Sequence, residues 1–73
     1  MDAAGYREAR RKFFEDLRDS HDRSIEYWMR IWRKSNSVEE MTEIYERMCD
    51  HGAASQYCQE AIKALKMMDE AED

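Results

Sequence analysis

The chain contains no proline and only two glycines, so little in it interrupts a helix. Alanine, glutamate, arginine, lysine, methionine and glutamine, which favour helix, are frequent along its length. Its 73 residues make one domain at most. We therefore predict an all-α fold, a small helical bundle in which residues 1–73 form a single helical domain.

The sequence SNSVEE marks the clearest helix boundary. Ser37 and Glu40 have the spacing of a capping box, and apolar residues recur after them with a helical period. This pattern predicts a helix from about Val38 to His51. Gly52 then offers a C-terminal stop, after which a further apolar stripe predicts another helix.

The N-terminal half carries two apolar stripes, one from Tyr6 to Leu17 and one from Ile25 to Trp32. Between them lies RDSHDRS, where Ser20 and Asp22 could cap a new helix, although no glycine or proline forces a break. One helix from about Ala3 to Lys34 and two shorter helices both fit this pattern.

Two architectures follow from these alternatives. One is a bundle of three to four short helices, and the other is a long helical hairpin that dimerises into a four-helix bundle. A lone core in a chain this small supplies only about 3–5 kcal/mol, so we expect a homodimer. The acidic end, about residues 69–73, is unfavourable at a helix C-terminus and is predicted to fray.

The charge is unevenly distributed. Residues 1–34 carry nine Lys/Arg and seven Asp/Glu, whereas residues 35–73 carry three and ten. The acidic half favours a protein partner with a basic surface, whose approach it would steer. The chain has no apolar run of transmembrane length and no secretory signal, and Cys49 and Cys58 form no disulfide framework. We expect a cytoplasmic protein without membrane contact.

The sequence SIEYWMRIW contains more apolar residues than one buried helix face needs. A helical wheel places Trp28 and Trp32 on the main apolar face, and Tyr27 and Ile31 on the far side. Either this is a central helix that its own chain covers on two sides, or one face meets another subunit or protein. Trp, Tyr and Arg are enriched at interfaces. The candidate partner-binding residues are Tyr27, Trp28, Arg30, Ile31 and Trp32, with the dimer centred on Trp28 and Trp32.

No motif for catalysis or for cofactor binding is present, and we expect a non-enzymatic protein without cofactor. Cys49, His51 and Cys58 are metal-ligand types, but their spacing is not that of a structural zinc site, so no metal is predicted. The N-terminal arginines could instead grip phosphates, although neighbouring carboxylates fit an ordinary ion-paired helix surface. These candidates for nucleic-acid contact are Arg7, Arg10, Arg11 and Arg18.

The segment from Tyr27 to Arg47, YWMRIWRKSNSVEEMTEIYER, resembles the first two helices of the Hha/YmoA family. The resemblance covers about 20 residues and requires a one-residue insertion. It implies a small helical protein that binds nucleoid-associated H-NS proteins and modulates gene expression. The first 24 residues have no counterpart in that family, and the resemblance is too short to assign membership.

Taken together, these patterns predict a protein-binding module that acts through an aromatic and methionine-rich helical face, as an adaptor, a chaperone or a stoichiometric inhibitor. The alternative is a nucleic-acid-associated or transcription-linked regulator that uses the arginine-rich N-terminal helix.

Overall fold

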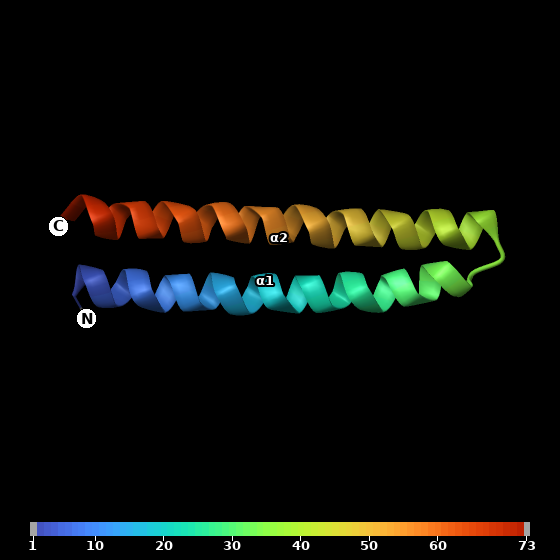
Figure 1. The fold of residues 1–73 in the computed structure, drawn as a ribbon, viewed down its shortest axis with the longest axis horizontal. Coiled ribbons are helices and arrows are strands. Elements are labelled where there is room, and N and C mark those ends of the chain that lie inside the picture. Colours follow the sequence, from blue (N-terminus) through green and yellow to red (C-terminus); the bar gives the residue numbers. More distant parts are fainter. Residues whose placement is uncertain (1, 73) are drawn as a thin grey trace.

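Two long helices, connected by a three-residue turn, make up the structure, a computed structural model that describes residues 2–72 (Figure 1). Helix α1 spans Ala3–Lys34 and helix α2 spans Val38–Glu72. They run antiparallel, with the two ends of the chain side by side and the turn at the opposite end. The prediction of an all-α fold is confirmed. The hairpin is the architecture that fits, whereas a bundle of three to four helices is not seen within the described part of the chain.

The helix boundaries follow from local capping chemistry. Asp2 precedes α1, and its carboxylate accepts a hydrogen bond of 2.7 Å from the backbone N–H of Gly5. Ser37 precedes α2, and its hydroxyl accepts a hydrogen bond of 3.3 Å from the N–H of Glu40. Each cap satisfies an N–H group that has no partner within the helix. The boundary predicted at SNSVEE is therefore confirmed.

Both helices continue through the positions where the sequence allowed a break. Helix α1 is unbroken at Ser20 and His21, which selects the single N-terminal helix. Helix α2 is unbroken at Gly52, so the predicted stop there was wrong. Gly52 has no positive φ angle, and the helix continues to pack against α1 beyond it. The contact with α1 therefore overrides the weak helix propensity of one glycine.

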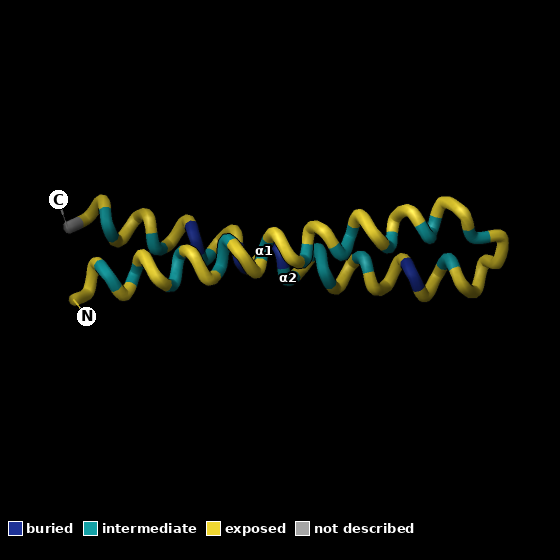
Figure 2. The backbone as a smooth tube through the Cα atoms, turned by 90° about the horizontal axis from the view of Figure 1, so that it is seen from below, coloured by how far each residue is buried: buried dark blue, intermediate teal, exposed yellow. Residues whose placement is uncertain are grey.

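The helices meet along one row of residues each, here called the seam, whose members alternate at spacings of three and four. This is the spacing of an antiparallel coiled coil. Every one of these side chains is buried or half-buried, as Figure 2 shows along both helices. On α1 and its C-terminal cap the seam consists of Arg7, Arg11, Phe14, Arg18, His21, Ile25, Trp28, Trp32 and the cap residue Ser35. On α2 it consists of Met41, Ile44, Met48, His51, Ser55, Cys58, Ile62, Leu65 and Asp69.

The core that this seam creates is thin. Among the described residues, Ile44, Cys58 and Ile62 are the buried hydrophobic side chains, and Ser55 is the buried polar one. The molecule measures 55 × 16 × 13 Å, so it is one helix thick in its narrow direction. A pair of helices has no third layer to cover its flanks, and many apolar side chains therefore remain on the surface.

Helix α2 includes the segment predicted to fray, up to Glu72, whereas residue 73 lies outside the described residues. Fraying of this acidic end stays a prediction. Neither helix, within the described residues, combines the length and the apolar character needed to cross a membrane.

Candidate functional site: two apolar surfaces on the hairpin

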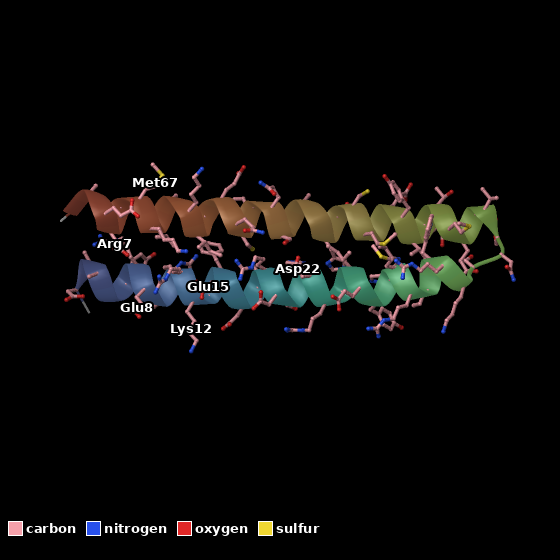
Figure 3. All side chains as sticks on the ribbon, in the orientation of Figure 1. Arg7, Glu8, Lys12, Glu15, Asp22 and Met67 are labelled. Carbon is pink, nitrogen blue, oxygen red and sulfur yellow. The ribbon has the colours of Figure 1, made fainter. Side chains whose placement is uncertain are left out.

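The middle of the seam is polar. The Nδ1 atoms of His21 and His51 lie 2.8 Å apart, which is a hydrogen bond in which one ring donates and the other accepts. Beside it, the Ser55 hydroxyl donates a hydrogen bond of 2.7 Å to the Asp22 carboxylate, and Figure 3 shows Asp22 between the helices. These bonds join α1 to α2 and fix the alignment of the two helices. A buried polar pair that fixes register is a known use of such groups in coiled coils.

The arginines considered for nucleic-acid contact have partners within the chain. Arg7 lies between the helices (Figure 3) and forms a 2.6 Å ion pair from its Nε to the carboxylate of Asp69. The guanidinium of Arg10 lies over two aromatic rings, 4.9 Å from the centre of Phe13 and 5.2 Å from that of Phe14. Both arginines therefore stabilise the open end of the hairpin, by charge and by cation–π contact.

The other two arginines are seam residues. Arg18 forms an ion pair of 3.2 Å with Asp19, and Arg11 lies 4.0 Å from the carboxylate of Glu8. Long arginine stems can cover apolar surface while the charged ends reach water. The four candidate arginines do not form one exposed basic face, and nucleic-acid contact through them stays a prediction.

The five candidate partner-binding residues lie in the half of α1 that leads into the turn. Tyr27 is exposed and meets the ring of Trp28 edge-on, with ring centres 5.3 Å apart. Trp28 is half-buried in the seam, with the guanidinium of Arg47 from α2 5.0 Å from its ring. Arg30 is exposed. The main apolar face predicted for Trp28 is thus the face that packs on the chain's own second helix.

Ile31 is half-buried and borders a depression beside the turn, together with Lys34, Ser35, Asn36, Ser37 and Glu40. Trp32 is half-buried and borders a different depression on the other side of the seam. The structure therefore brings the candidates Tyr27 and Ile31 to one side of the hairpin and opens Trp32 towards the other. Binding of a partner by these residues stays a prediction.

An apolar depression lies at the turn end of the hairpin, and we call it the loop groove. It is lined by Trp32, Val38, Met41, Thr42 and Tyr45. Trp32 and Met41 form its half-buried floor, whereas Val38 and Tyr45 are exposed. Val38 is 80% exposed, although valine is usually a buried residue.

A second set of exposed apolar side chains lies near the chain termini, and we call it the terminal patch. The patch consists of Tyr6, Phe13 and Leu17 from α1 with Tyr57 and Met68 from α2. Ring contacts connect its two helices: Phe13 meets Phe14 edge-on, and Phe14 meets Tyr57 with ring centres 6.2 Å apart.

The two surfaces lie on opposite sides of the hairpin. Each patch residue directly precedes a seam position, as Phe13 precedes Phe14, whereas Thr42 and Tyr45 directly follow one. Successive residues are rotated by about 100° around a helix, so preceding and following residues project to opposite sides. In an antiparallel pair the preceding residues of both helices share one side. The exposed apolar residues of α2 therefore lie on one side of the hairpin before Gly52, at Tyr45, and on the other side after it, at Tyr57 and Met68.

The cysteines do not extend these surfaces into a metal site. Cys49 is exposed, Cys58 is buried, and both are free thiols. Within residues 2–72, no three His, Cys, Asp or Glu side chains are grouped so that they could hold a metal ion.

Comparison with known proteins gives no relative from which a function could be transferred. No protein-family model matches the chain, and neither a curated protein nor a solved structure matches it.

Sequence reasoning missed the α2 half of the loop groove. Val38, Met41 and Tyr45 recur at helical spacing, which predicted a helix but did not separate covered from uncovered positions. Only Met41 belongs to the seam, and the other two project to one side of it. The signal that could have separated them is the regular alternation of threes and fours through Met41, Ile44 and Met48, which leaves Val38 and Tyr45 outside.

Proposed function

We propose that this protein is a non-enzymatic protein-binding module, an adaptor or a stoichiometric inhibitor, that holds a partner protein in its loop groove. The observation that carries the proposal is the exposure of Val38 and Tyr45 around the half-buried Trp32 and Met41. Aromatic and methionine side chains in a shallow depression are the composition of protein-interaction surfaces.

The expected partner presents an apolar segment with basic residues. Glu39 and Glu46 are exposed on the same turns of α2 that form the groove wall. Acidic residues around an apolar centre raise the association rate of a basic partner and suppress acidic competitors. Of the candidates from the sequence, Trp32 lines this groove, whereas Tyr27 and Ile31 lie on the other side of the seam.

The proposal is tested by placing a photo-crosslinking amino acid at Thr42 in cells that produce the chain. Thr42 lines the groove and is exposed. The matched control is the same amino acid at Arg23, which is exposed on α1 away from the groove. We expect a discrete adduct with one other protein from position 42, no such adduct from position 23, and loss of the adduct when Val38→Asp is added.

Two results would overturn the proposal. One is the same set of adducts from positions 42 and 23, which would indicate non-selective contact. The other is an adduct at position 42 that Val38→Asp leaves unchanged. Helicity of each variant is measured by circular dichroism, so that a lost adduct is attributed to the groove and not to unfolding.

A further inference from the structure

The hairpin exposes more surface than its mass requires. Its accessible surface is 5786 Å². A compact monomer of 8.8 kDa is expected to expose about 4,800 Å². The excess, about 1,000 Å², is slightly more than the roughly 800 Å² that one partner buries in a standard protein interface. The hairpin therefore has the surplus surface that a stable complex would remove.

The terminal patch holds much of the apolar part of this surface. Tyr6, Phe13, Tyr57 and Met68 are each at least half exposed. They occupy one side of the hairpin in its terminal half, where α1 contributes large side chains. Helix α2 places Ala61 and Ala64 between Tyr57 and Met68 on the same side, since both alanines also precede seam positions.

We propose that a second copy of the chain covers the terminal patch, with both turns at the same end, and completes a four-helix bundle. A two-fold axis along the length of the hairpin would bring α1 of each copy against α2 of the other. Phe13 then faces the small side chains Ala61 and Ala64 of the second copy, and Tyr6 faces Met68. Large side chains meet small ones, as close packing requires, and the same contacts occur twice, as two-fold symmetry requires.

The charges on α2 select this orientation over the reverse one. On the patch side, the turn half of α2 carries the exposed residues Glu40, Glu43, Arg47 and Asp50. A copy placed with its turn at the opposite end would lay these charged side chains on Tyr57, Ala61, Ala64 and Met68. Burying carboxylates against apolar groups without partners is costly. Placing both turns at one end keeps the apolar half of α2 against the aromatic row of α1. The charged half of α2 then faces Ser24, Tyr27, Ile31 and Lys34 of the other copy, where Lys34 lies opposite Glu40 and offers it an opposite charge.

This inference does not depend on the proposed function, because the loop groove lies on the other side of the hairpin and stays open in such a dimer. It also differs from the dimer expected from the sequence, since Trp28 and Trp32 lie in the seam within one chain.

The first test is the molar mass of the full chain in solution, by light scattering over a range of concentrations. We expect twice the mass of one chain, and a return to 8.8 kDa for Phe13→Asp. Met67→Asp is the matched control, because Met67 is equally exposed but points away from α1, as Figure 3 shows. Met67→Asp and Tyr45→Asp are both expected to remain dimeric. A monomeric wild type, or a Phe13→Asp variant that stays dimeric, would overturn the inference.

The orientation is tested by spin labels on the turn. Asn36→Cys in a Cys49→Ala background places one exposed thiol at the turn, since Cys58 is buried. With both turns at the same end, the distance between the two labels is expected to be well below the 55 Å length of the hairpin. A distance close to that length would refute the proposed orientation. If Tyr45→Asp abolishes a partner adduct but not the dimer, the two surfaces are shown to act separately.

Discussion

The thin core predicts that one buried side chain carries a large share of the stability. Ile62 is 6% exposed and lies in the half of the seam where the opposing helix contributes several arginines. Ile62→Ala removes three carbon atoms, whose transfer from water contributes about 0.8 kcal/mol each. The cavity left behind adds to this loss, and such substitutions cost about 2–5 kcal/mol. We expect a loss of about 3 kcal/mol for Ile62→Ala, within that range.

That loss is close to the whole stability of the chain, because a single core of this size supplies only about 3–5 kcal/mol. The measurement is urea unfolding followed by the helical signal in circular dichroism, at one fixed protein concentration. With a dependence of about 1 kcal/mol per molar urea for a small chain, the midpoint is expected to fall by about 3 M. The fixed concentration matters because association adds to the apparent stability.

The control is Val38→Ala, which removes fewer atoms from a side chain that is 80% exposed. We expect a change within about 0.5 kcal/mol for this surface position. Equal midpoint shifts for Ile62→Ala and Val38→Ala would refute the reasoning, since they would mean that the seam between α1 and α2 is not the core of the folded chain.

Three further substitutions test other parts of the fold. Gly52→Ala is expected to stabilise the hairpin by about 1 kcal/mol in thermal unfolding, because an added Cβ meets nothing within 4 Å and alanine favours the helix interior; a destabilised variant would contradict the continuous α2. Ser37→Ala is expected to cost about 1 kcal/mol by removing the cap of α2, and an unchanged urea midpoint would speak against that cap. His51→Ala is expected to cost about 1–3 kcal/mol in urea unfolding, because it leaves the half-buried Nδ1 of His21 without its hydrogen-bond partner in the seam, and an unchanged midpoint would speak against that bond.

The polar middle of the seam explains how a thin core can still specify one alignment. Apolar contacts alone would tolerate a shift of one helix along the other by a turn. The His21–His51 and Ser55–Asp22 bonds would both be broken by such a shift, and buried polar groups without partners are costly. The Arg7–Asp69 ion pair constrains the same alignment at the open end.

The sequence by itself determined the helices and the turn between them. The absence of proline, the helical spacing of apolar residues and the cap at Ser37 are local features, and local features set where a helix starts. The single helix over Ala3–Lys34 was one of the two alternatives that this local pattern allowed. Gly52 was interpreted as a helix end because the low helix propensity of glycine is also a local feature. No local signal shows that α2 packs against α1 both before and after Gly52.

Only the tertiary structure decided which apolar residues are core and which are surface. Periodicity placed Met41 and Tyr45 in one stripe, yet Met41 lies in the seam and Tyr45 projects to its side, because an opposing helix covers only a narrow strip of each helix. The same packing placed Trp28 within the chain and left Phe13 on the surface. A helical period gives the direction in which each side chain projects from the axis of its own helix. The position of the second helix decides which of those directions is covered.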